Sequence, residues 1–254
     1  MLNIQVNCIW FLRGEVALNS KIITVWGPNG GGKTSVAVSL GVSLSERNVM
    51  VGIVSSKLYY GELQSVFGKR LEQDKGIYKA ITNGCNTKNM FESAGNGSNL
   101  FFLSVPNGFD SMLLTAISGE TAKDILEDAA MRFDYLIVDG SEELNNPFSS
   151  VGLTMANHVI VVHKASTKDC LWQSSIENTV QLLNLESKII HVLNGYDRTC
   201  DKMSYLSGVG VKFDAELPHI HNAQVLLNAG KNLYSSGGSH EYKKTVQRLA
   251  SRLM

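Results

Sequence analysis

The chain has 254 residues, of which 44% are hydrophobic, and its 23 basic and 23 acidic side chains give a net charge of zero. This length and composition suit one α/β domain with a substantial buried sheet, or at most two small domains. A neutral chain has no overall charge that would draw it to nucleic acid or membrane, although a local patch still could. No apolar run reaches the roughly 18 residues that a membrane span requires.

The cysteines and the N-terminal residues bear on the compartment. Cys8, Cys85, Cys170 and Cys200 lie far apart and form no C-x-x-C pair. This spacing favours free thiols in a reducing compartment over a disulfide framework or a metal site. The apolar residues 8–12 are too few for the core of a signal peptide and follow no basic segment. We therefore expect a cytoplasmic protein.

Strand-like and helix-like segments alternate along most of the chain. Residues 1–20 precede the first core strand, and we treat them as an N-terminal extension that could be an edge strand, a short helix or an arm to a partner. Residues 21–254 are expected to form a single domain. Its predicted strands cover residues 22–26, 49–54, 100–105, 135–138, 158–163, 188–193 and 211–217. Its predicted helices cover residues 34–46, 121–132, 168–183, 223–229 and 242–253, with only short helices and loops expected over 55–99.

This alternation predicts an α/β fold with a mostly parallel central sheet and helices on both faces. Continuous apolar runs such as residues 49–54 are typical of strands that are buried on both sides. In such folds a ligand lies beyond the carboxyl ends of the strands. Polar residues directly after predicted strands are therefore the first candidates for a binding site.

The strongest candidate is the turn at residues 27–34, which reads GPNGGGKT and fits the phosphate-loop pattern G-x-x-x-x-G-K-T. It lies between an apolar strand and a helical segment, as this motif requires. Glycines let backbone N–H groups approach phosphate oxygens, and the helix N-terminus adds its dipole. We expect Lys33 to reach the β- and γ-phosphates and the Thr34 hydroxyl to bind Mg²⁺. The alternative is a glycine-rich surface turn.

Two later polar residues also follow predicted strands. Asp139 comes after strand 135–138, and Asn194 comes after strand 188–193. Because the carboxyl ends of parallel strands share one edge of the sheet, we expect both residues to lie near the loop of Lys33. Taken alone, each also fits a simple turn.

Together these motifs resemble the MinD/ParA class of P-loop ATPases. The matching segments are VWGPNGGGKTS at 25–35, FDYLIVD at 133–139, VIVV at 159–162, VLN at 192–194, ELP at 216–218, and residues 223–230. The resemblance covers residues 21 to about 254 and is weak between 55 and 132.

This resemblance implies ATP and Mg²⁺ as ligands. It places Asp139 beside the metal through water, at the start of the second switch, and places Asn194 on the adenine base, with the residues near Pro218 flanking that base. The implied nucleotide-binding loop residues are Asn29, Gly30, Gly31, Gly32, Lys33, Thr34 and Ser35. Lys33 and Asp139 are the implied catalytic residues, and Thr34 and Asp139 the implied metal site.

The sequence departs from this family at three places. Pro28 stands where the family has a signature lysine that reaches the partner's phosphates, and proline has neither charge nor N–H donor. Ser55 and Lys57 stand where the family has the two aspartates of the first switch, and serine is a poor base at neutral pH. We expect Lys57 to be a solvated loop residue, with a place near phosphate as the alternative. Residues 142–143 are both Glu and are expected to be a solvated acidic turn.

These departures predict an ATP-binding spatial organiser or assembly factor with weak or absent hydrolysis, similar in character to TadZ/CpaE-like pilus-assembly proteins. Expected partners are a second copy of the chain or another protein of a larger assembly, with recruitment to the membrane or cell pole. The alternative is an active ParA-type ATPase of plasmid partition or conjugation that binds DNA. A third reading is an interaction module that binds no nucleotide, and the intact loop disfavours it.

The last predicted helix allows three interpretations. Apolar residues recur along it at intervals of three and four, from Tyr242 to Leu253, and Lys244, Arg248 and Arg252 recur on another face. Such a helix could hold membrane or nonspecific DNA. We expect instead that it closes the domain by packing on the sheet. His219 and His221 are expected to be loop histidines, since no further ligand lies at metal-binding spacing.

Overall fold

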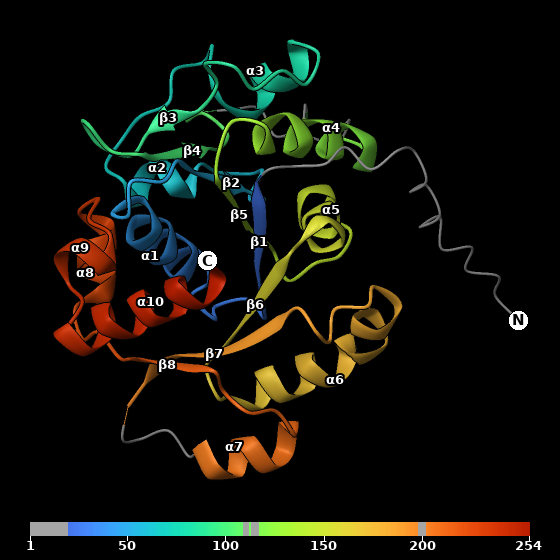
Figure 1. Ribbon diagram of the computed structural model, residues 1–254, viewed down its shortest axis with the longest axis vertical. Coiled ribbons are helices and arrows are strands. Elements are labelled where there is room, and N and C mark those ends of the chain that lie inside the picture. Colours follow the sequence, from blue (N-terminus) through green and yellow to red (C-terminus); the bar gives the residue numbers. More distant parts are fainter. Residues whose placement is uncertain (1–19, 109–111, 113–116, 198–201) are drawn as a thin grey trace, which may run out of the picture.

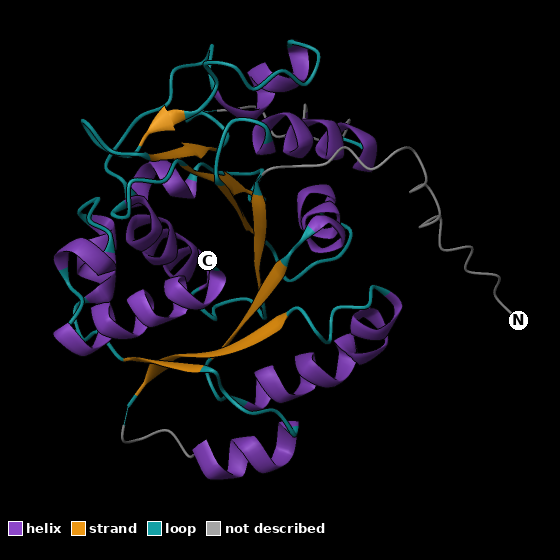
Figure 2. Cartoon of the chain, viewed as in Figure 1, coloured by secondary structure: helices purple, strands orange, loops and turns teal. Residues whose placement is uncertain are grey.

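The computed structural model describes residues 20–108, 112, 117–197 and 202–254, which form an eight-stranded sheet covered by helices (Figures 1 and 2). The strands are β1 Lys21–Trp26, β2 Val51–Ser55, β3 Glu92–Ser93, β4 Leu100–Leu103, β5 Tyr135–Asp139, β6 His158–His163, β7 Ile189–Tyr196 and β8 Ala215–Pro218. The helices are α1 Lys33–Ser45, α2 Glu62–Val66, α3 Gly76–Thr82, α4 Gly119–Ala130, α5 Pro147–Met155, α6 Thr167–Leu182, α7 Lys202–Val209, α8 Ala223–Asn228, α9 Leu233–Ser236 and α10 His240–Leu253.

The strands lie in the order β3-β4-β2-β5-β1-β6-β7-β8, and every neighbouring pair is parallel except β3 with β4. This arrangement confirms the predicted mostly parallel α/β fold. β1 lies between β5 and β6, and its side chains are almost fully buried because helices cover both faces of the sheet. The loop after β1 and Asp139 at the end of β5 therefore lie at the same edge.

Two helical layers enclose the sheet. Helices α1, α8, α9 and α10 lie on one face, and α4, α5 and α6 lie on the other (Figure 1). The first face buries one large apolar cluster that runs from α1 through the sheet to α10. The second face buries separate clusters under α4 and α5 and under α6. This burial supplies the main driving force for folding and holds the strand ends rigidly beneath the binding edge.

The two late strands differ from their predicted limits. The predicted strand 211–217 is observed only at Ala215–Pro218, and β7 continues through Asn194 to Tyr196. The late start has a local cause, since the Asp214 carboxylate accepts a hydrogen bond from the His191 N–H at 2.8 Å, a donor that a strand partner would otherwise use. The register between β7 and β8 is irregular at Asn194 and Tyr196. Asn194 therefore lies within a strand rather than directly after one.

Some predictions fall outside the described residues. These are the structure of the N-terminal extension, of which only Ser20 is described, and the states of Cys8 and Cys200. Cys85 and Cys170 are free thiols, as predicted. Among the helices of the described residues, none combines the length and the apolar character that crossing a membrane would need.

The apolar stripe of α10 packs inside the protein. Tyr242, Val246, Leu249 and Leu253 are all buried in the cluster shared with α1 and the sheet, and the Tyr242 Oη lies 2.9 Å from the Ser39 Oγ of α1. The protein itself therefore covers the stripe, as expected for a helix that closes the domain. The stripe is not available to hold a membrane in this conformation.

Leu249→Ala should lower the free energy of unfolding by about 2–5 kcal/mol, because it leaves a cavity between α10 and α1. Arg248→Ala, at the neighbouring exposed position, should change it by less than about 0.5 kcal/mol. Urea denaturation of both variants measures the difference. Equal, small effects would contradict the packed role of this helix.

Candidate functional site

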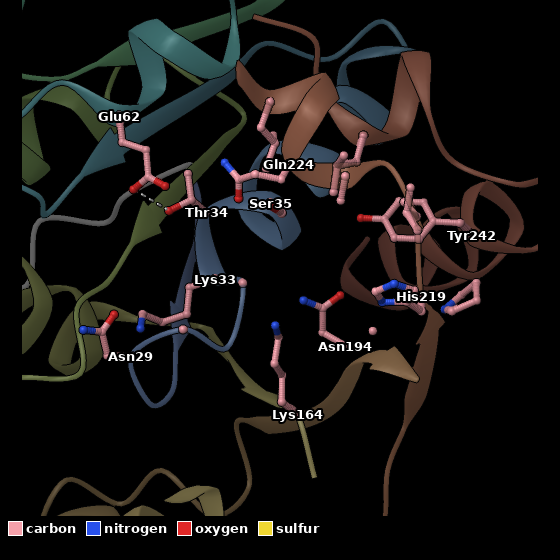
Figure 3. Close-up of a pocket in the computed structure, with 18 of the residues that line it drawn as sticks. Asn29, Lys33, Thr34, Ser35, Glu62, Lys164, Asn194, His219, Gln224 and Tyr242 are labelled. Atoms are coloured by element: carbon pink, nitrogen blue, oxygen red, sulfur yellow. Dashed lines mark hydrogen bonds between the residues drawn. The ribbon is translucent and has the colours of Figure 1, made fainter. Parts of the chain in front are cut away.

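A cavity of about 400 Å³ opens at the carboxyl edge of the sheet (Figure 3). The loop after β1, the start of α1, the ends of β7 and β8, and helix α8 all contribute to its wall. Its lining includes eight of the nine predicted nucleotide-binding residues, all but Gly31: Asn29, Gly30, Gly32, Lys33, Thr34, Ser35, Asn194 and Pro218. This volume lies in the range that small-molecule and cofactor sites occupy.

The glycine loop has the backbone geometry that its sequence requires. Gly27 has a φ of +145°, and a Cβ there would lie 2.5 Å from the carbonyl oxygen of Val162 on β6. Gly32 has a φ of +88° and forms the N-terminal boundary of α1. A side chain at either position would be strained or would clash, so glycine is needed there. These glycines let the loop pack closely on the strand ends and let α1 begin at the cavity.

Lys33 is buried at the base of the loop. Its Nζ donates a hydrogen bond to the Pro28 carbonyl at 3.0 Å. Burial lowers the pKa of Lys33 from 10.5 to about 8, although the nearby Asp139 carboxylate opposes this shift. Pro28 carries no positive charge of its own and instead provides the acceptor that holds the Lys33 ammonium.

The Thr34 hydroxyl and Asp139 meet below the loop. The hydroxyl donates to Asp139 Oδ2 at 2.8 Å, and Asp139 is fully buried. Burial raises the pKa of Asp139, whereas Lys57, the Thr34 hydrogen bond and Lys33 oppose that rise. The other carboxylate oxygen, Oδ1, makes no hydrogen bond within the described part of the chain. A hydroxyl beside an unsatisfied carboxylate oxygen fits Mg²⁺, which prefers hard oxygen ligands.

Ser55 and Lys57, which the resemblance aligns with the two first-switch aspartates, lie at and just after the end of β2. Ser55 is fully buried at the end of β2, and its Oγ accepts a hydrogen bond from the Lys57 N–H at 3.1 Å. The Lys57 ammonium pairs with the carboxylate of Glu62 in the first turn of α2. Lys57 also lines the cavity, and a place near phosphate stays a prediction.

Glu62 is a site residue that the sequence reading missed. Its Oε2 lies 3.2 Å from the Thr34 Oγ1, a contact drawn in Figure 3. The only local signal was an acidic residue in the first turn of a short predicted helix. The contact arises because α2 comes directly after β2, and β2 and β1 both lie beside β5, so the start of α2 and the start of α1 are at the same edge of the sheet.

The apex of the loop is held from two sides. The Asn29 N–H donates to Glu142 Oε2 at 2.5 Å, and the Asn29 carbonyl accepts from Lys168 Nζ at 2.9 Å. Lys168 and Glu142 also form an ion pair at 3.9 Å. Glu142 therefore contacts the loop, which corrects its interpretation as a solvated residue, while Glu143 is exposed. Lys168, at the start of α6, was not predicted as a site residue.

Asn194 on β7 contacts the glycine loop directly. Its amide Nδ2 donates to the Gly31 carbonyl at 2.9 Å, and it occupies the space that a Cβ on Gly32 would need. Its contact with an adenine base stays a prediction. His219, Gln224 and Tyr242 also line the cavity (Figure 3).

The two loop histidines carry no metal cluster. The rings of His219 and His221 lie 5.5 Å apart. The ranges 20–108, 117–197 and 202–254, with residue 112, contain no group of three or more His, Cys, Asp or Glu side chains that could hold a metal ion.

Comparisons with known proteins agree with this geometry. A family model described as an AAA domain matches residues 20–194, which is more than half of the chain. The chain belongs to this AAA-domain family. A comparison with curated proteins found no match.

Solved structures of the MinD/ParA class share the fold. A ParA family ATPase from Chlorobium tepidum is 17% identical, with 91% of this chain and 99% of that chain covered and a TM-score of 0.77. The septum site-determining protein MinD from Pyrococcus horikoshii, complexed with Mg-ADP, is 16% identical, with 92% and 96% covered and a TM-score of 0.76. A putative plasmid partition protein from Borrelia burgdorferi, bound to AMPPNP, is 15% identical, with 92% and 98% covered and a TM-score of 0.73. The predicted MinD/ParA-type P-loop fold is confirmed.

The buried charge of Lys33 should make stability depend on pH. Its folded pKa of about 8 lies below the unfolded value of 10.5, so burying the ammonium costs roughly 3 kcal/mol at pH 7. This cost is lost as pH rises from about 8 to about 10.5, because the folded state deprotonates first. Without nucleotide, Lys33→Met should have a higher free energy of unfolding than wild type at pH 7. This gap in the free energy of unfolding should narrow by pH 10. Urea unfolding at both pH values measures it, and a gap that stays constant would refute the shift.

Proposed function

We propose that the chain binds ATP with Mg²⁺ and acts as a MinD/ParA-like spatial organiser or assembly factor with weak or absent hydrolysis. One observation carries the proposal. The contacts bring Lys33, Thr34 and Asp139 together at one edge, as phosphate and metal binding would need, while Pro28, Ser55 and Lys57 stand at the positions that the resemblance assigns to the signature lysine and the switch aspartates. Binding and turnover depend on different residues, so one can persist without the other.

Nucleotide binding has the firmer support. The Lys33 ammonium, the α1 N-terminus and the glycine backbone all lie at one end of a cavity of about 400 Å³. Asn194, Pro218 and His219 line the same cavity, and we propose that they contact the base. The P. horikoshii relative is complexed with Mg-ADP, and the B. burgdorferi relative is bound to AMPPNP.

Slow turnover follows from the first-switch position. Hydrolysis needs an oriented water and stabilisation of the charge that develops on phosphate. Ser55 is buried, and its hydroxyl accepts a hydrogen bond from the Lys57 backbone N–H. A neutral serine hydroxyl is too weak a base to take a proton from water at neutral pH. Pro28 supplies no cation to a partner's phosphates. We propose Lys33 and Asp139 as the catalytic residues of whatever turnover remains.

The cellular role follows the same reasoning. A protein that holds ATP without rapid turnover suits an assembly or localisation factor, in which ATP acts as a slow switch. TadZ/CpaE-like pilus-assembly proteins are the model for this role. We propose a cytoplasmic protein made of one nucleotide-binding domain after an N-terminal extension, recruited to membrane or cell pole by a partner.

A second candidate is a ParA-type partition or conjugation ATPase that binds DNA. One observation favours it: a groove between the end of α1 and α10 is lined by Arg47, Lys244 and Arg248. Cations of this kind hold DNA through its phosphates. The groove also contains Glu46, and Arg47 is engaged by the Gln247 carbonyl and the Ser251 hydroxyl, so fewer of its charges are free for phosphate.

A titration with ATP and a turnover assay should separate these roles. Wild type should bind ATP with Mg²⁺, and Lys33→Ala should weaken binding by at least about tenfold, because it removes the ammonium from the phosphates. Phosphate release by wild type should be negligible. Rapid release that Lys33→Ala abolishes would favour the second candidate. Failure to bind either ATP or ADP would leave only an interaction module.

Pro28 should also affect assembly. Without a cation at this position, ATP should produce little change in the mass of wild type, measured by light scattering with and without the nucleotide. Pro28→Lys should increase the ATP-dependent dimer, because it restores a charge that can reach a partner's phosphates. A strong ATP-dependent dimer of wild type would show that other residues provide this contact.

A further inference from the structure

Two carboxylates converge on one hydroxyl at the cavity. Thr34 Oγ1 lies 2.8 Å from Asp139 Oδ2 and 3.2 Å from Glu62 Oε2. A hydroxyl has one proton and can donate it to only one of them. Two carboxylates at such close quarters repel each other unless a cation lies between or beside them.

The buried member of this pair has an unused oxygen. Asp139 Oδ1 is buried and has no hydrogen-bond partner among the residues that the structure describes. Leaving a charged oxygen buried and unsatisfied is costly, and native proteins rarely do so. A hydrated divalent cation beside Thr34 would satisfy this oxygen.

We propose that Glu62 is the second carboxylate of the Mg²⁺ site, in place of the aspartates that are missing after β2. This inference rests on the proposed binding of Mg²⁺ with ATP. Glu62 comes from the first turn of α2 and reaches the same hydroxyl as Asp139. It holds the ion and does not contact the reacting atoms, so it is a positioning residue.

Lys57 provides the counter-charge when no metal is bound. Its ammonium pairs with the Glu62 carboxylate and also lines the cavity. The ion and the Lys57 ammonium compete for the same carboxylate, so metal binding frees Lys57 to face the nucleotide phosphates. The same substitution that removed the switch aspartates thus added a cation beside the site.

The first experiment compares the affinity for AMPPNP with Mg²⁺ and with EDTA. Glu62→Gln keeps the size of the side chain and an acceptor oxygen but removes the charge. The gain from Mg²⁺, which is the ratio of the AMPPNP affinity with Mg²⁺ to that with EDTA, should fall by at least about fivefold. The affinity in EDTA should stay equal or improve. Glu72→Gln removes the same charge from an exposed position beyond α2 and should keep the wild-type gain. An unchanged gain in Glu62→Gln would overturn the proposal.

The second experiment measures Mn²⁺ binding by electron paramagnetic resonance without nucleotide. Lys57→Met should bind Mn²⁺ more tightly than wild type, because it removes the competing ammonium, and adding Glu62→Gln should cancel this gain. Equal Mn²⁺ binding by Lys57→Met and the double variant would refute the role of Glu62. If wild type binds no AMPPNP under either condition, the proposed function fails, while these Mn²⁺ titrations still decide whether Glu62 holds the ion.

Discussion

Two opposite charges, Lys33 and Asp139, are buried together at the carboxyl edge of the sheet, and the arrangement of the site depends on them. Burial lowers the pKa of the lysine and raises that of the aspartate, and each opposes the shift of the other. Neither charge could be held there without the rigid strand ends and the glycine loop above them. Nucleotide phosphates would pair with the Lys33 ammonium, and a divalent cation would pair with the Asp139 carboxylate.

Several cations surround this edge of the sheet. Pro28 removes a charge from the loop, yet Lys57 and Lys164 line the cavity and Lys168 contacts the loop apex. All of these come from the same chain. A cation from the same protomer can neutralise the phosphate charge without a partner, whereas a cation from a second protomer would require the two protomers to associate. Under the proposed function, nucleotide state and assembly would therefore be less tightly coupled.

Local patterns predicted most of the fold and the loop side of the site. Continuous apolar runs located six strands, because strands buried on both faces need apolar residues at every position. They failed at β8, where the Asp214 carboxylate takes a strand donor, and at β3, which has only two residues. Glu62, Glu142 and Lys168 escaped prediction for a common reason. Each acts through a contact with the loop that is distant in sequence, and exposed charged residues have no local pattern that marks such contacts.

By itself, the sequence determined that the chain has a phosphate loop between a strand and a helix, because glycine spacing and hydrophobic period are local properties of the backbone. The resemblance also indicated that Pro28, Ser55 and Lys57 differ from the residues expected at their positions. Only the tertiary structure decided what surrounds them. The carboxylates of Glu62 and the buried Asp139 meet at Thr34, and the Lys57 ammonium pairs with Glu62, because parallel strands bring distant segments to one edge. The interaction between two charges depends on their separation in space, and the order of residues along the chain does not give that separation.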